Sequence, residues 1–174
     1  MVIRKRLKIQ GPALAFITIT VKDWLPIFML EPAADDIIEQ FKETVHIFKI
    51  SVMGYVLMPS HLHVLIGLPE IERLSKFVQS FKSLSSRRIK ILELAKYHNS
   101  LYENGKFRLW KPRFDDVILK SEKQFNIKLE YLHNNPVKAG LVKKATNWRY
   151  SSAADWYDNR QGLIKINKDF RWLD

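Results

Sequence analysis

Residues 58–66 read MPSHLHVLI and carry two histidines separated by one apolar residue. Side chains two positions apart on a β-strand point to the same face, so His61 and His63 would project together. Two adjacent imidazoles are close enough to bind one metal ion. A pair alone is equally compatible with two partly exposed strand residues that make ordinary hydrogen bonds, so a metal site needs a third ligand.

A candidate for that ligand lies in residues 129–142, LEYLHNNPVKAGLV. Tyr131 and Asn135 are four residues apart, which places them on one face of a helix, while Leu129 and Leu132 mark the face turned to the core. A phenol and an amide oxygen would then stand side by side. The structural alternative is that Asn135 only belongs to a helix stop before Pro136, and that Tyr131 only packs.

The elements that must position these side chains follow from the hydrophobic pattern. Strand patterns alternate with two amphipathic helices, and Ser121 with Gln124 forms a capping box for a last helix that we expect Pro136 to close. The tight connection at Pro59-Ser60 predicts an antiparallel hairpin. We expect strands at 13–21, 49–58, 61–68 and 113–119, and helices at 32–48, from Leu74 to about Ala95, and from 121 to about 135.

This order is β-α-β-β-α-β with a further helix, which predicts an α+β fold of the ferredoxin-like type with an antiparallel sheet. The additional helix carries the tyrosine. We expect the 174 residues to form one domain, 1–174, with a core at about 13–142 and a short C-terminal extension at about 143–174.

Composition narrows the function classes. The chain has no cysteine, which excludes disulfides, thiolate metal sites and thiol catalysis. It has neither a signal-peptide pattern nor an apolar stretch long enough to span a membrane, so we expect a soluble intracellular protein with no membrane partner. Lys and Arg total 29 against 18 Asp and Glu, and the resulting charge of +11 suits a polyanion such as nucleic acid.

The basic side chains suggest where that polyanion binds. Cations on the second helix and after the tyrosine helix could neutralise phosphates, and aromatic residues near the C-terminus could stack on unpaired bases. The alternative for the aromatic residues is packing within the C-terminal extension. The candidate DNA-binding residues are Lys82, Arg87, Arg88, Lys90, Lys138, Lys143, Lys144, Trp148 and Tyr150.

Taken together, four segments resemble the REP-associated tyrosine transposases, relatives of the single-tyrosine transposases of small bacterial insertion sequences. They are MPSHLHVLI, RLWKPRFDDVIL, YLHNNPVKAGLV and WRYSSAADW, in this order. The resemblance covers roughly residues 13–157. The chain departs from the family pattern at Ser60, where Asn is frequent, and at 115–117, where an aromatic residue, Asp and His are frequent.

The resemblance implies a histidine-hydrophobic-histidine endonuclease and strand transferase that depends on Mg²⁺ or Mn²⁺. By position, His61 and His63 match the metal-binding pair, Tyr131 the nucleophile that forms a 5′-phosphotyrosine link, and Asn135 the polar residue that completes the metal site. It also implies a cytoplasmic bacterial protein acting on single-stranded or hairpin DNA, with a homodimer as one form that related enzymes take. Two alternatives stay open: a single-stranded nucleic-acid-binding module without cleavage, and a metal-dependent hydrolase that uses water.

Overall fold

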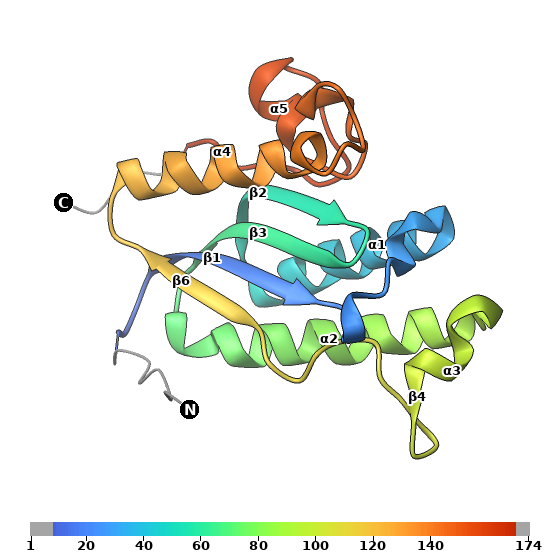
Figure 1. The fold of residues 1–174 in the computed structure, drawn as a ribbon. Coiled ribbons are helices and arrows are strands. Elements are labelled where there is room, and N and C mark those ends of the chain that lie inside the picture. The colour runs from blue at the N-terminus through green and yellow to red at the C-terminus, as the bar shows by residue number, and fades with distance from the viewer. Residues whose placement is uncertain (1–8, 170–174) are drawn as a thin grey trace.

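A four-stranded antiparallel sheet forms the centre of the molecule (Figure 1). The computed structural model describes residues 9–169, so the basic start of the chain and the last five residues of the predicted extension lie outside the described residues. The strand order is β2-β3-β1-β6, which confirms the ferredoxin-like prediction. The strands are β1 (Ala13–Thr20), β2 (Ser51–Met58), β3 (His61–Leu68) and β6 (Asp115–Leu119).

Two long helices cover one face of the sheet. These are α1 (Glu31–Phe48) and α2 (Leu74–Ile91), and both were expected from helical spacing. Alternate strand residues, such as Ile17 and Val64, pack beneath them in a large apolar core. The second helix ends earlier than expected, at Ile91, because Glu93 adopts a left-handed backbone with φ 45° that cannot continue an α-helix.

The opposite face carries α4 (Glu122–Lys138), the predicted tyrosine helix. It begins as expected, since the Gln124 backbone N–H donates to Ser121 Oγ at 3.3 Å and the Lys120 N–H donates to Gln124 Oε1 at 2.8 Å. The prediction that Pro136 closes this helix is wrong: Pro136 is buried inside its last turn. A proline so near the end removes one N–H, and the next turn still forms through Ala139 N–H to Asn135 O at 2.9 Å.

Smaller elements fill the connections. Between α2 and β6 lie α3 (His98–Leu101) and a hairpin of β4 (Tyr102–Glu103) and β5 (Lys106–Phe107), which the sequence pattern did not predict. Near the C-terminus lies α5 (Ala153–Tyr157). No helix within residues 9–169 is both long and apolar enough to cross a membrane.

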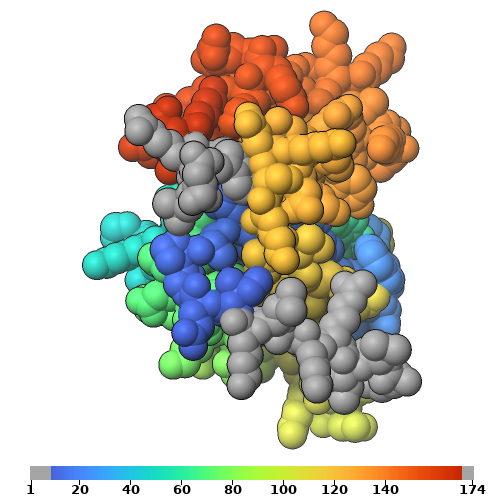
Figure 2. Space-filling view, turned by 90° about the vertical axis from the view of Figure 1, so that its left-hand side faces the viewer, coloured from blue at the N-terminus to red at the C-terminus, as the bar shows by residue number. Residues whose placement is uncertain are grey.

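The C-terminal segment packs along the outer edge of β2. Backbone hydrogen bonds join Leu57 N–H to Tyr150 O at 2.8 Å and Ser152 N–H to Tyr55 O at 3.0 Å, so this segment covers the outer edge of β2. In Figure 2, which is turned by 90°, this red and orange region lies at one end of the molecule and the green α2 region at the other. The C-terminal segment packs on both faces of the sheet, because Tyr150 belongs to the core under α1 and α2 and Trp156 packs against the core under α4.

Candidate active site

The two histidines lie on the α4 face of the sheet, as their spacing predicts. Leu62 between them points into the core under α1 and α2, whereas Leu65, two residues after His63, belongs to the core under α4. The ring centroids of His61 and His63 are 4.6 Å apart. One small ion can therefore contact both rings.

Two hydroxyl groups hold the histidine rings. Thr18 Oγ1 lies 2.8 Å from His63 Nδ1, and Ser60 Oγ lies 3.2 Å from His61 Nδ1. The Thr18 contact follows from strand register, because Thr18 of β1 is paired directly with His63 of β3. With Nδ1 engaged in each ring, Nε2 is the nitrogen that can face a ligand.

Both rings are held in the neutral form. Burial lowers the pKa of His61 to about 4. Burial, together with the charges of His61 and Lys128, lowers the pKa of His63 to about 3. Neutral imidazole is the form that binds a metal ion, so the pair is suited to coordination at neutral pH.

The Tyr131 side chain of α4 packs next to this histidine pair. Its ring centroid lies 5.5 Å from that of His63 and 5.9 Å from that of Phe16, edge-on in both cases, and the side chain remains 41% exposed. Leu129 and Leu132 set the distance between α4 and the sheet, because both are buried against β2. They pack at Gly54, where a larger residue would place a side chain in their space. The phenol is thus both next to the histidines and open to a large substrate.

Asn135 lies one turn after Tyr131 on the same helix. Its Nδ2 donates to the Tyr131 backbone carbonyl at 2.8 Å, which turns the side chain back along the helix and leaves the amide oxygen as its free ligand atom. The surviving last turn of α4 keeps Asn135 in helical register with Tyr131. Its assignment as the third metal ligand stays a prediction.

His133 points away from the site, as its two-residue offset from Tyr131 predicts. It is buried, and its ring nitrogens bond to Tyr157 Oη at 3.1 Å and Ser152 Oγ at 2.8 Å. Ser152 Oγ also accepts from the Tyr55 N–H at 2.9 Å. This network ties α4 to β2 and to the C-terminal segment, and so fixes the rotation of the helix that presents Tyr131.

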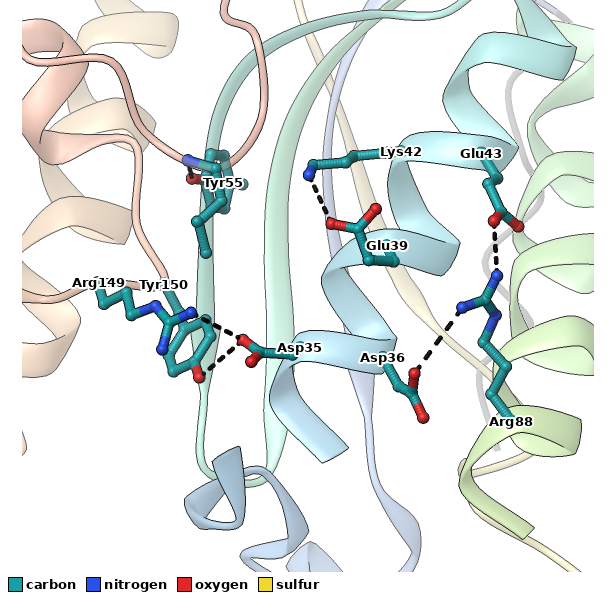
Figure 3. A network of polar contacts seen from close by, with 10 residues as sticks. Asp35, Asp36, Glu39, Lys42, Glu43, Tyr55, Arg88, Arg149 and Tyr150 are labelled. Atoms are coloured by element: carbon teal, nitrogen blue, oxygen red, sulfur yellow. Dashed lines mark hydrogen bonds and ion pairs between the residues drawn. The ribbon is translucent and has the colours of Figure 1, made fainter. Parts of the chain in front are cut away.

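The structure divides the predicted DNA-binding residues between two faces. Those of α2 lie on the side of the sheet opposite to Tyr131 (Figure 1). Arg88 bonds to Gln40 at 2.9 Å and Glu43 at 2.5 Å, and so joins α2 to α1, as Figure 3 shows for Glu43. Lys82 donates to the carbonyls of Lys111 and Arg113 at 2.8 and 3.0 Å. Arg87 and Lys90 are exposed.

The remaining predicted residues lie near α4 or in the C-terminal segment. Lys138, Lys143 and Lys144 are exposed. Trp148 donates from Nε1 to the Leu57 carbonyl at 2.9 Å, and the buried Tyr150 donates to Asp35 at 3.0 Å, a contact drawn in Figure 3. These contacts join the C-terminal segment to β2 and α1, and the role of the two aromatic residues in DNA binding stays a prediction.

Three residues at the site were missed from the sequence. Lys128 has its Nζ 5.5 Å from the Tyr131 ring centroid, and its position three residues before Tyr131 would have been a usable signal. Thr18 and Trp24 had no local signal. Trp24 packs edge-on against His61 at 5.5 Å between centroids, a contact that only the folded chain creates.

Comparison with known proteins identifies the family. The family model described as Transposase IS200 like matches residues 16–135, well over half of the chain. The chain therefore belongs to the IS200-like transposases, which confirms the relationship expected from its motifs.

Individual relatives point to one branch of that family. A Haemophilus influenzae protein named "Putative REP-associated tyrosine transposase" is 23% identical over 139 residues, 80% of this chain and 78% of that protein. The REP-associated tyrosine transposase of Escherichia coli K12 is 27% identical over 101 residues, 58% of this chain and 53% of that protein. A solved REP-associated tyrosine transposase bound to a REP hairpin has the same fold, with a TM-score of 0.71, 20% identity and coverage of 100% of this chain and 98% of that chain.

Proposed function

We propose that this transposase cuts and rejoins single-stranded DNA beside a hairpin, with Tyr131 as the nucleophile. The observation that carries the proposal is the meeting of one exposed phenol and two neutral imidazoles on one face, with the Tyr131 and His63 rings 5.5 Å apart. The relative solved with a REP hairpin supports the choice of substrate. The rings of His61, His63 and Tyr131 meet within one chain.

In the proposed reaction, Tyr131 Oη attacks the phosphorus of a phosphodiester. The bond from Oη to phosphorus forms while the bond from phosphorus to the 3′-oxygen breaks, and the 3′-oxygen takes up a proton to become a free hydroxyl. The phenol proton passes to water. Attack of a 3′-hydroxyl on the phosphotyrosine reverses these steps and rejoins DNA without ATP.

The residues present fit a divalent cation. His61 and His63 offer Nε2 atoms on neutral rings that are oriented through Nδ1, and the Asn135 amide oxygen is the proposed third donor. Within residues 9–169 no group of three His, Cys, Asp or Glu side chains could hold an ion, so the pair needs a donor of this other type. When bound, Mg²⁺ or Mn²⁺ would polarise a non-bridging phosphate oxygen. Two nitrogen ligands favour Mn²⁺.

Lysines beside the phenol would attract the substrate backbone. Lys128 Nζ lies 5.5 Å and Lys138 Nζ 6.0 Å from the centroid of the Tyr131 ring. Both ammonium groups lie beside the Tyr131 ring, so a phosphate bound at Tyr131 Oη would lie near two positive charges. They would hold the phosphate next to the nucleophile and offset its negative charge.

Binding without cleavage is less well supported. Single-stranded RNA-binding domains of this strand order stack bases on aromatic side chains of an exposed sheet. Here α1 and α2 cover one face, and α4 covers much of the other. The part of the sheet near the surface carries histidines where such domains carry aromatic stacking residues.

The test is replacement of Tyr131 by Phe. This change removes one oxygen and keeps the ring contacts, so hairpin binding and stability should stay close to those of the parent. Cleavage of labelled hairpin oligonucleotides from repeats flanking the gene, with Mn²⁺, should fall by several orders of magnitude. The covalent protein–DNA species on a denaturing gel should disappear.

Tyr102→Phe is a matched control, because Tyr102 lies in the β4–β5 hairpin, where its ring packs on His98 and Phe107, and has no part in the proposed site. It should cleave like the parent. A parent that cuts DNA without ever forming the covalent species would show that water is the nucleophile. A parent that binds hairpins and never cuts them would leave only the binding-module function.

A further inference from the structure

A pocket of about 350 Å³ opens on the far side of the histidine pair from Tyr131. It lies where β1 ends and β6 begins. Its lining comes from segments about ninety residues apart in the sequence: Thr20, Trp24, Lys111, Pro112, Arg113, Phe114 and Asp115. Thr20 is paired with His61 across the sheet, so the pocket and the proposed metal site share a wall.

Trp24 in this pocket is exposed to solvent, and its backbone conformation is unfavourable. Trp24 is 54% exposed, and both Asp23 and Trp24 adopt left-handed backbones with φ of 54° and 56°. Such a conformation is unfavourable for residues other than glycine, and its occurrence beside a reactive site is typical of a functional constraint. The turn holds the Trp24 ring against His61, and Lys111 Nζ lies 4.4 Å from the ring centroid.

The order in which the four rings contact one another indicates on which side of the cleaved phosphate the pocket lies. Tyr131 contacts His63, His63 contacts His61, and His61 contacts Trp24. Displacement at a phosphodiester places the attacking and leaving oxygens on opposite sides of the phosphorus. With the phosphate over the histidines and Tyr131 attacking from one side, the leaving 3′-oxygen points toward Trp24.

We propose that this pocket binds the base of the nucleotide immediately 5′ to the cleaved phosphate, the nucleotide that leaves with the free 3′-hydroxyl. This inference rests on the proposed function, because it takes its orientation from Tyr131. The base stacks on Trp24, and Lys111 and Arg113 neutralise the neighbouring phosphates. The pocket thus selects where the strand is cut.

The carboxylate of Asp115 at this pocket affects which bases the pocket binds. Asp115 is exposed and pairs across the sheet with Thr18, the residue that holds His63. A carboxylate repels phosphates but accepts hydrogen bonds from amino groups on base edges. Adenine, cytosine and guanine carry such an amino group, whereas the one base donor of thymine, N3–H, lies between two carbonyl oxygens that a carboxylate repels. Asp115 therefore disfavours thymine at the nucleotide 5′ to the cut.

The experiment uses hairpin oligonucleotides from repeats flanking the gene, with 2-aminopurine replacing one base of the single-stranded flank at a time. Binding is measured in chelator, so that no cleavage occurs, and the cut position is mapped separately with Mn²⁺. Fluorescence should be quenched most strongly at the position 5′ to the cut, because that base stacks on Trp24. Trp24→Ala and Trp24→Leu should abolish this quench and weaken binding by about tenfold.

Ile91→Ala, at an exposed position at the end of α2, is the control and should keep the quench. Trp24→Leu keeps an apolar side chain, and its melting temperature should match that of the parent. A quench unchanged in both Trp24 variants, or one centred at another position, would overturn the subsite. The Tyr131 mechanism would survive that result if the covalent species still formed.

Base choice provides an independent readout. Thymine at the position 5′ to the cut should weaken binding to the parent several-fold relative to cytosine. Asp115→Asn offers an amide that accepts and donates, so the difference between the two bases should shrink. Equal affinity of the parent for both bases would remove the role of Asp115. A Trp24-dependent quench in a parent that never cleaves DNA would overturn the subsite together with the proposed function.

Discussion

The two faces of the sheet differ in what they bury. Under α1 and α2 the buried side chains of β1, β2 and β3 are hydrophobic, and ion pairs such as those of Arg88 lie between the two helices (Figure 3). Under α4 the apolar core is smaller and stops partway along the strands. Beyond Phe16 and Leu65 the same face carries Thr18, His61 and His63. One face stabilises the fold, and the other has a smaller core and holds the residues of the proposed site.

The residues of the proposed site are held by the regular elements that carry them. The histidines lie on β3, a central strand paired on both sides, so their positions are set by the β1 and β2 ladders. Tyr131 sits on a helix whose neighbouring leucines are buried. Sites built on such elements hold their geometry better than sites on loops. The apolar face thereby supports the chemistry of the polar one.

The largest expected effect comes from damaging the apolar face. Phe41 of α1 is fully buried and packs edge-on against Phe77 and Phe81 at 6.1 and 5.5 Å between centroids. Phe41→Ala should lower the free energy of unfolding by about 3–5 kcal/mol, measured in urea. Ile47→Ala, exposed on the same helix, should change it by no more than about 0.5 kcal/mol.

Cleavage by the folded fraction of Phe41→Ala should stay at the parental rate at low temperature. That result would keep the two faces separate in function. A large loss of cleavage in protein that is still folded would show instead that packing under α1 reaches the histidines through the sheet.

A medium effect is expected from the polar face. Thr18→Val keeps the shape of the side chain and removes the hydroxyl that holds His63. Mn²⁺ affinity, measured by calorimetry, should fall by about 10–100-fold, because the ring loses its orienting partner. Thr44→Val is the matched control: Thr44 bonds to the Gln40 carbonyl within α1, so its removal should leave Mn²⁺ affinity unchanged. Equal affinities in the Thr18 variant and the parent would contradict the role of Thr18 in orienting His63.

The smallest effect concerns the path of the DNA. Lys128 lies beside Tyr131, whereas Arg87 lies on α2 across the sheet. Lys128→Ala should reduce the slope of log affinity against log salt by about 0.7 for hairpin DNA with a single-stranded flank, as expected for one lost phosphate contact. Arg87→Ala should reduce it only if the DNA also reaches α2. If Arg87→Ala changed this slope and Lys128→Ala did not, the DNA would bind on the face of the sheet that α1 and α2 cover.

Local periodicity in the sequence determined most of the fold. Alternation and helical spacing are properties of neighbouring residues, so the strands, the long helices and the cap at Ser121 could be predicted without tertiary information. For the same reason, two features of the site were predictable. His61 and His63 share one face of a strand, and Tyr131 and Asn135 follow each other by one turn on one helix. The exceptions were Pro136, whose effect on α4 depended on its place in the last turn, and α3 with the β4–β5 hairpin, which the sequence pattern did not predict.

Tertiary structure alone decided how the site is supported. Thr18 reaches His63 across 45 residues of sequence, and Trp24 meets Lys111 only because β1 and the segment before β6 end side by side. The separation of the α2 cations from Tyr131 likewise depends on which face each helix covers. Strand register and helix placement arise from burial of the whole apolar surface at once, and no short stretch of sequence carries that information.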